Sequence, residues 1–386
     1  MTGVQTCALP ISLAPDSLKP GLVHAYDRFM GTKSPYGANW GALRAGTFWS
    51  ILYYPQDVIA QNPLEIWDWH QGSDDSAGLG IFTFRNAYEN EDDILVQFKT
   101  RLRQPGQAHD GPDGLGFRII GLGDPFAVGG GRDQDIGELN QATVYPSSPD
   151  LNVTRNANTG ALVGTPLVKP NGGGHVIASM ATNNVGTSSH KRWFITDFDS
   201  VQTGADAVIV VADTTANGAF WQLPTFLGNS VTTSGNTFTI TGSNDATLKG
   251  TILHPGGTPS ITVGTKARGS SYAVEDSAAG DYNGNLVEHA ADPVNFPLVG
   301  ENRYLHFQGG GDGDFLVVMT MMKTGSHPAV SQTGGTVADA QIQVGNKNYA
   351  LQTDNVLYST GTDTPVSYSA PDATVTFDAD GKGSLG

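Results

Sequence analysis

The pattern of apolar and polar positions divides the chain into a short helical beginning and a long succession of strands. Residues 17–31 and 42–54 carry apolar side chains at helical spacing, and Pro55 ends the second run. After Pro63 the pattern changes to short apolar or alternating runs separated by Gly, Asn, Asp and Ser. We therefore expect no long helix beyond about residue 60.

Two strand-like runs, residues 80–88 and 94–103, flank the acidic turn ENEDD and predict a β-hairpin. In the second run Lys99, Arg101 and Arg103 are spaced two apart, so they share one face of the strand. The apolar side chains of that run point the other way. The basic stripe is either a solvated face or a surface beside an anionic ligand.

Further strands follow at short intervals. The run DAVIVVAD, residues 206–213, is apolar through its middle and predicts a strand that is buried on both faces. This succession is typical of a large antiparallel β-sandwich or of stacked sheets. The other expected strands are 117–122, 126–128, 142–145, 174–181, 192–198, 236–241, 247–253, 260–264, 304–308, 314–322, 340–345, 348–351, 355–359 and 373–377.

The organisation of the chain follows from this pattern and from one unusual segment. MTGVQTCALPIS resembles the read-through translation of a sequencing-library adapter, and it lacks the basic start and long apolar core of a signal peptide. We exclude it, with Cys7, and expect the natural chain to begin upstream. The region 280–303 is rich in Asp, Asn, Pro and Gly and indicates a boundary. The expected parts are residues 1–12 (adapter), 13–62 (helical), 63–290 (central β-sandwich) and 291–386 (smaller C-terminal sheet).

Composition and charge restrict the classes of function. The 386-residue chain carries a formal net charge of −16, which argues against nucleic-acid binding because that requires a basic surface. It contains 50 glycines, and its 15% of charged residues is well below the roughly 25% of a typical domain. A single cysteine excludes an intrachain disulfide, and no apolar run of about 18 residues predicts a membrane span.

Common catalytic motifs are absent from the sequence. There is no G-x-S-x-G, H-E-x-x-H, P-loop or Cys-x-x-Cys, and no two of the nine histidines are spaced as a local metal pair. The stretch HDGPDGLGF places His109, Asp110 and Asp113 just before a predicted strand. Taken alone, these residues form either a tight turn or, less simply, a calcium site built from carboxylates and carbonyls.

The order of several short motifs resembles the heparinase II/III-like polysaccharide lyases. In that family a strand entry of the form His-x-His-x-Asp-x-x-x-Phe precedes a glycine turn. Here His109, Gly111, Asp113 and Phe117 occupy that register, and RIIGLGDPFAVGGG follows. The preceding FRNAY, and the later HKRWFITDF, DAVIVVAD and FWQLP, resemble the family's other strands in the same order. The resemblance covers nearly all of residues 13–386.

The resemblance implies a mainly β fold, with a large antiparallel sandwich (supersandwich) and a smaller C-terminal sheet unit. The early helices would be the end of an α/α toroid that is otherwise missing. His109 matches the family's catalytic histidine. The positions of the family's zinc ligands read Gly111, FAVGGG, and Asn140 with Gln141, so no metal and no cofactor are expected. The toroid's catalytic groups cannot be placed on this chain.

Lyases of this family cleave uronic-acid polysaccharides by β-elimination, so the resemblance implies an anionic polysaccharide as the partner. Neutralising the uronate carboxylate makes its C5 proton removable, and a base then takes that proton. We expect His109 to act as the base or as the neutralising group. Arg85, Tyr88 and Arg132 are candidates for holding the anionic sugar, or they are a hairpin cation, a strand-end aromatic and a loop charge. The protein is expected in the periplasm or outside the cell.

Two other classes of function stay open. A non-catalytic β-sandwich that binds glycans, or a structural surface module, fits the absence of the zinc ligands and of most of the toroid. A glycoside hydrolase needs two facing carboxylates, and the segments 89–93 (ENEDD) and 197–199 (DFD) supply acids. Trp67 and Trp69 are candidates for stacking on sugar rings or for packing in a core.

Overall fold

The computed structural model of the protein describes part of the helical beginning and most of the β-rich remainder. The predictions for residues 1–12, for a helix at 42–54 and for Trp67 and Trp69 lie outside the described residues. The described residues are 14–27, 55, 57–66, 80–90, 92–100, 114–128, 142, 144–145, 160–169, 171–180, 190–215, 219–267, 301–361, 366–367, 375–377 and 383–385.

Short helices precede and interrupt the strands. Helix α2 (Lys19–Ala25) lies within the predicted run 17–31 and has a proline in its first turn, where the missing N–H costs no hydrogen bond. Helices α4 (Pro63–Ile66) and α5 (Ser200–Thr203) have four residues each. In the described part of the chain beyond residue 60 these are the helices, which confirms the expectation that no long helix follows there.

A central antiparallel sheet forms the middle layer of the molecule. Its strands run in the order β12-β13-β14-β17-β10-β9-β8-β6, and β7 also pairs with β8. Their bounds are β6 Gly160–Leu162, β7 Leu167–Val168, β8 Gly174–Met180, β9 His190–Asp197, β10 Ala207–Thr214, β12 Ser230–Ser234, β13 Thr237–Thr241, β14 Thr247–His254 and β17 Phe315–Met322.

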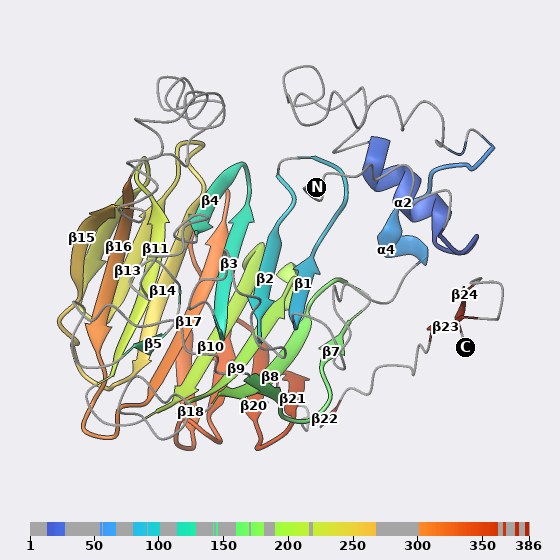
Figure 1. Cartoon of the computed structure of the whole chain (residues 1–386). Coiled ribbons are helices and arrows are strands. Elements are labelled where there is room, and N and C mark those ends of the chain that lie inside the picture. The colour runs from blue at the N-terminus through green and yellow to red at the C-terminus, as the bar shows by residue number, and fades with distance from the viewer. Residues whose placement is uncertain are drawn as a thin grey trace.

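Two four-stranded sheets, β1-β2-β3-β4 and β15-β16-β11-β5, cover one face of the central sheet (Figure 1). They adjoin where β4 meets β11, and there the Val128 N–H donates to the Pro224 carbonyl oxygen at 3.0 Å. The bounds are β1 Ile81–Arg85, β2 Leu95–Lys99, β3 Gly116–Gly121, β4 Asp124–Ala127, β5 Val144–Tyr145, β11 Phe220–Phe226, β15 Thr262–Ala267 and β16 Glu301–Gln308.

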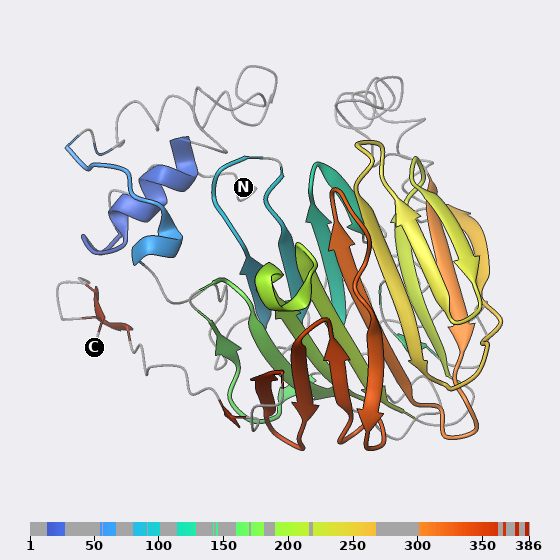
Figure 2. The same cartoon turned by 180° about the vertical axis from the view of Figure 1, so that it is seen from behind.

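A five-stranded sheet, β18-β19-β20-β21-β22, covers the opposite face of the central sheet (Figure 2). We call it the C-terminal sheet. Its bounds are β18 Val330–Gly334, β19 Gln341–Val344, β20 Lys347–Leu351, β21 Val356–Thr360 and β22 Val366–Ser367, and a separate pair follows, β23 Val375–Phe377 with β24 Gly383–Leu385. The fold is therefore mainly β with several antiparallel sheets, as the sequence predicts.

Strand β10, in the middle of the central sheet, is buried on both faces. On β10, Ile209 and Val211 point into the core beneath the outer sheets, whereas Val208 and Val210 point into the core beneath the C-terminal sheet. All four are fully buried, which confirms the prediction from DAVIVVAD. Alternation along a strand sends successive side chains to opposite faces, so a strand between two layers must be apolar throughout.

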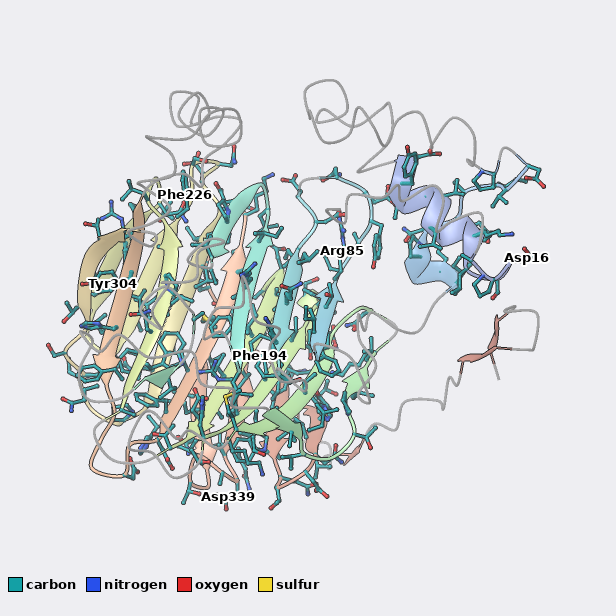
Figure 3. The ribbon with its side chains drawn as sticks, viewed as in Figure 1. Asp16, Arg85, Phe194, Phe226, Tyr304 and Asp339 are labelled. Carbon is teal, nitrogen blue, oxygen red and sulfur yellow. The ribbon has the colours of Figure 1, made fainter. Side chains whose placement is uncertain are left out.

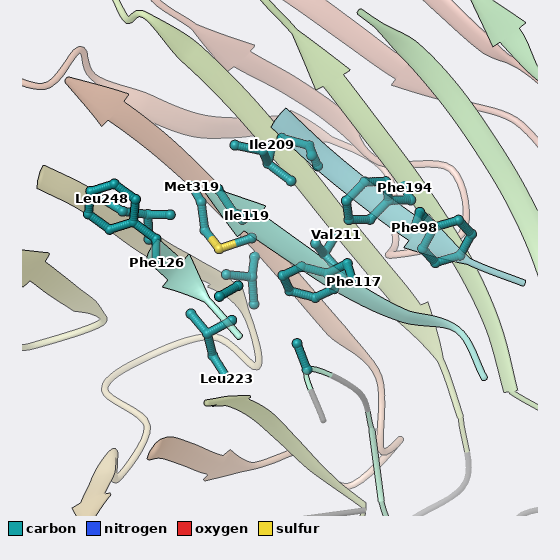
Figure 4. Close-up of a cluster of buried hydrophobic side chains, with 14 of the residues drawn as sticks. Phe98, Phe117, Ile119, Phe126, Phe194, Ile209, Val211, Leu223, Leu248 and Met319 are labelled. Atoms are coloured by element: carbon teal, nitrogen blue, oxygen red, sulfur yellow. The ribbon is translucent and has the colours of Figure 1, made fainter. Parts of the chain in front are cut away.

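The first core lies between the outer sheets and the central sheet, and it packs aromatic rings among aliphatic side chains (Figure 4). Phe98 on β2 stacks on Phe194 of β9 with ring centroids 4.8 Å apart. Phe117 on β3 lies 5.3 Å from the Phe194 ring and 6.3 Å from Trp221 on β11. Rings from three strands thus join the outer layer to the central sheet.

The second core joins the central sheet to the C-terminal sheet. Trp193 on β9 is buried there, and its indole Nε1–H donates to the Gln352 carbonyl oxygen at 2.6 Å. The Asn346 N–H, next to β20, donates to the carbonyl oxygen of Gln202 in α5 at 2.8 Å. Side-chain packing and backbone hydrogen bonds therefore both hold the C-terminal sheet in place.

The strands within the expected part 291–386 belong to more than one sheet. Strand β16 pairs with β11 and β15, and β17 lies between β10 and β14 in the central sheet. The separate sheet begins only at Val330. The polar composition of 280–303 does not report which sheet the following strand joins.

Candidate functional site

The structure describes two of the four predicted site residues. Arg85 ends β1, and Tyr88 lies in the turn between β1 and β2. His109 and Arg132 belong to segments 101–113 and 129–141, which lie outside the described residues. The hairpin turn and the described residues that flank those two segments therefore define the candidate site.

Arg85 and Tyr88 lie against one another in the turn of the first hairpin. The Arg85 guanidinium carbon is 4.5 Å from the centroid of the Tyr88 ring. Arg85 Nη2 donates to the Asp93 carboxylate at 2.8 Å, and Arg85 Nε donates to the Ala87 carbonyl oxygen at 2.6 Å. Asp93 also accepts from the Glu89 N–H at 2.8 Å. The arginine thus organises the turn that presents the tyrosine.

The environment of Tyr88 keeps its phenol protonated. Burial raises the pKa of Tyr88, the charge of Arg85 lowers it and the charge of Asp93 raises it, with a net increase. A neutral phenol donates a hydrogen bond to an anionic oxygen, and at neutral pH it can supply a proton but cannot serve as a base.

The helical segments contact this same turn (Figure 3). His24 of α2 forms a hydrogen bond from Nε2 to the Tyr88 carbonyl oxygen at 2.7 Å. Asn62, just before α4, donates from Nδ2 to the Glu89 carboxylate at 3.0 Å. The junction therefore gathers an imidazole, a phenol, a guanidinium and carboxylates at one edge of the outer layer.

The segments that carry His109 and Arg132 leave the sheet at its other end. Arg85 pairs with Leu95, whereas Lys99 at the far end of β2 pairs with Gly116 at the start of β3. Strand β4 runs antiparallel to β3, so Val128 after β4 also points toward the start of β3. The described residues next to the His109 segment (101–113) and next to the Arg132 segment (129–141) therefore lie at the same end of the sheet. The Arg85 turn lies at the opposite end.

A buried charge cluster lies beneath that shared end. Arg192 on β9 donates to Asp213 on β10 through Nε at 2.6 Å and Nη2 at 2.9 Å, and the two residues are direct cross-strand partners. His190 Nε2 donates to the same carboxylate at 2.6 Å. Burial raises the pKa of Asp213, but the charges of Arg192 and His190 and their hydrogen bonds outweigh it and lower that pKa overall.

The remaining guanidinium nitrogen of Arg192 holds the ends of both segments. Arg192 Nη1 donates to the carbonyl oxygen of Leu115, just after segment 101–113, and to that of Ala142, just after segment 129–141, at 3.2 Å. Leu115 has a positive φ of 57°, which a leucine rarely adopts. The arginine therefore stabilises a strained start of β3.

The sequence signatures meet at this point. Phe117 follows Leu115 on β3, and its ring lies 5.5 Å from the Arg192 guanidinium and beside Trp221. Asp213, which ends DAVIVVAD, binds the Arg192 of HKRWF. The motifs are separated in sequence, but they form one packed unit beside Leu115, at the start of β3.

Several site residues carried no local sequence signal. His24 and Tyr88 are 64 positions apart, and nothing in the pattern linked them. The carboxylate of Asp93 belonged to the predicted acidic turn, and its bond to Arg85 follows from the short hairpin. Among the described residues, no three His, Cys, Asp or Glu side chains gather as a metal site. No helix in the described ranges is long and apolar enough to cross a membrane.

Comparison with known proteins gives remote structural likeness only. No family model matches the chain, and no curated protein gives a significant match. A heparan sulfate lyase from Pedobacter heparinus is 12% identical, with a TM-score of 0.49 over 92% of this chain and 49% of that chain. A heparinase III with methylated lysines is 14% identical, with a TM-score of 0.48 over 81% of this chain and 46% of that chain.

The chain thus spans less than half the length of each of these structures. At such identities and TM-scores the likeness assigns neither a family nor an activity to the protein.

Proposed function

We propose that this chain is the β-sheet part of a polysaccharide lyase that cleaves a uronic-acid polysaccharide by β-elimination, in the periplasm or outside the cell. One observation carries the proposal. The motifs that suggested a lyase from sequence, on β3, β9, β10 and β11, pack together beneath the start of β3. His109 lies only six positions before Leu115, the residue that precedes β3.

The proposed chemistry assigns one task to each candidate residue. His109 removes the C5 proton or neutralises the uronate carboxylate, and an imidazole suits this because its reference pKa lies near 6.5. Arg132, on the segment that leaves the same end of the sheet, binds the carboxylate. Arg85 and Tyr88 bind the sugar chain at the hairpin turn, where the protonated phenol donates a hydrogen bond.

The test is an ultraviolet assay for the unsaturated product of β-elimination, because hydrolysis gives no such product. This chain, and the product of the gene extended upstream, are incubated with alginate, glycosaminoglycans and ulvan. We expect absorbance to rise with one substrate class and the rise to disappear in His109→Ala. The matched control is His254→Ala, which removes a half-buried histidine bonded to Asp312.

Three results would contradict the proposal in whole or in part. Retained turnover in His109→Ala would remove the assignment of that residue. New reducing ends without absorbance would indicate a glycoside hydrolase, and binding without any cleavage would indicate a glycan-binding module.

A further inference from the structure

A histidine is buried at the interface between the central sheet and the C-terminal sheet. His175 on β8 has an exposed fraction of 1%, and Tyr358 on β21 has 3%. His175 Nδ1 and the Tyr358 hydroxyl lie 2.9 Å apart in a hydrogen bond between the two sheets. The two rings are also stacked, with centroids 5.9 Å apart.

The charges around this pair are already balanced without His175. Lys169, in the turn before β8, lies 3.4 Å from Asp197 and 3.4 Å from the centroid of the Tyr358 ring. Lys347 on β20 lies 2.8 Å from the Asp199 carboxylate and 3.9 Å from Asp197. The titratable groups that face the interface beside His175 are Lys169, Asp197, Asp199, Lys347, Tyr349 and Tyr358.

A proton on His175 therefore has no counter-charge left to bind. Tyr349 and both lysines use Asp197, and Asp199 binds Lys347. Among the described residues, the buried Nε2 of His175 has no hydrogen-bond partner. A second cation beside Lys169 in a buried site would be costly, because a buried charge needs an opposite charge or hydrogen bonds.

We propose that His175 makes the docking of the C-terminal sheet sensitive to acid, so that the sheet separates from the central sheet as His175 takes up a proton. This device is independent of the proposed function. Burial first, and then the charge of Lys169, lower the pKa of His175 to about 3 in the docked state. In the separated state the imidazole is in water, with an ordinary pKa of about 6.5.

The direction of the effect follows from these two states. Between pH 6.5 and pH 3 the separated state binds one proton more than the docked state, so acid favours separation. The separated population approaches a tenfold rise for each pH unit well below 6.5, and it rises about 50-fold from pH 6.5 to 4.5. A sheet that loses the packing of its apolar face loses protection of its backbone amides, so separation is measurable by amide exchange.

The experiment is hydrogen exchange with mass spectrometry on the full chain between pH 7 and pH 4.5, corrected for the intrinsic exchange rate. Peptides from β19–β21 report on docking, and peptides from β12–β13, at the far edge of the central sheet, serve as the internal reference. Between pH 7 and pH 4.5 we expect opening of β19–β21 to rise about 75-fold more in the parent than in His175→Gln. Tyr358→Phe keeps the histidine and should keep the pH slope.

Two outcomes would overturn the proposal. An equal pH slope in the parent and in His175→Gln would show that other groups control the interface, and so would unchanged protection of β19–β21 down to pH 4.5. If His175→Gln does not fold, His175→Leu combined with Tyr358→Phe removes both hydrogen-bonding partners together and gives the same comparison.

Discussion

At the scale of single residues, the hydrogen bonds of Arg192 fix the described residues that border the candidate site. Its guanidinium is fully buried, binds Asp213 with two nitrogens and uses the third for the carbonyl oxygens of Leu115 and Ala142. A buried charge that loses its partner is strongly destabilising. The pair is therefore best understood as a unit that fixes two segment ends.

Replacement of Asp213 tests that interpretation. Asp213→Asn leaves Arg192 charged and buried without a counter-charge, so we expect a loss of about 3–5 kcal/mol in the free energy of unfolding. The measurement is urea unfolding at neutral pH. The control is Asp92→Asn, because Asp92 pairs with Lys323 on the surface with half its side chain exposed, where a loss below about 1 kcal/mol is expected. Equal losses would contradict a special role for the buried pair.

Two glycines share the same backbone angle, and only one of them, Gly172, lies beside the Arg85 turn. Gly172 and Gly257 both have a φ of +82°. A Cβ at Gly172 would overlap the carbonyl oxygen of Arg85, whereas a Cβ at Gly257 would meet nothing within 4 Å. We expect Gly257→Ala to cost about 1–2 kcal/mol from the left-handed backbone alone, and Gly172→Ala to cost clearly more. Thermal unfolding of both variants measures the difference, and equal losses would show that the turn moves aside freely.

At the scale of elements, the interface between the central and C-terminal sheets combines apolar packing with buried charges. Lys169 enters from the turn before β8, and Tyr349 and Lys347 come from β20. Burial lowers the pKa of Lys169 to about 8, although the Asp197 charge opposes the change. The same burial raises the pKa values of Tyr349 and Tyr358 well above the ordinary value. Because of these pKa shifts, the free energy of unfolding depends on pH in the alkaline range.

The alkaline behaviour can be measured. Between about pH 8 and pH 10 the unfolded chain keeps the Lys169 proton that the folded chain loses, so stability rises with pH, by at most about 2 kcal/mol. Above about pH 10 the buried tyrosines reverse the trend, because unfolded tyrosines ionise first. Chemical unfolding at pH 8, 9 and 10 should show the rise in the parent and in Lys323→Met but not in Lys169→Met. A rise that persists in Lys169→Met would assign it to another group.

At the scale of the whole molecule, three layers share two cores, and the central sheet contributes to both. The C-terminal sheet covers side chains such as Trp193, Ile195 and Val318, which are buried at 1% exposure or less. Burying a large apolar side chain contributes about 1.5–3 kcal/mol. The middle layer therefore depends on both neighbours for its solubility.

Removal of one layer tests this dependence. A chain that ends after Ala329 lacks the C-terminal sheet, so its central sheet would present a large apolar face to water. We expect this chain to bind a hydrophobic dye and to elute as aggregates in size-exclusion chromatography, whereas the full chain does neither. A soluble, monomeric truncated protein without dye binding would contradict the shared-core description.

The sequence predicts elements better than it predicts their neighbours. Alternating apolar and polar residues predict the hairpin β1–β2, and a continuous apolar run predicts β10, which is buried on both faces. Both patterns are visible in the sequence because a buried face requires apolar residues. Strand β12, SVTTS, is exposed and polar, and β6 and β7 have three and two residues, so no periodicity could reveal them. Their position depends on pairing with distant strands.

The same limit applies to the candidate site. Arg85 and Tyr88 are close because they share one turn, so the sequence alone brings them together. Arg192 and Asp213 were recognised in separate motifs, but only the register of β9 against β10 places them opposite one another. His24 and Tyr88 come from different parts of the chain, and their contact depends on how helix α2 packs.

The place of β17 in the central sheet has a consequence for synthesis. In the central sheet β17 lies between β10 and β14 and pairs with both. It ends at Met322, whereas β14 already ends at His254, so β17 is synthesised long after its two partners. At about 5–20 residues per second, a ribosome needs roughly 3–14 s to make the intervening chain. During that interval β10, which is apolar, and β14 each lack the partner for one edge. A nascent chain of this protein should therefore need a holding chaperone, and slow translation between these strands should lower the yield of soluble protein.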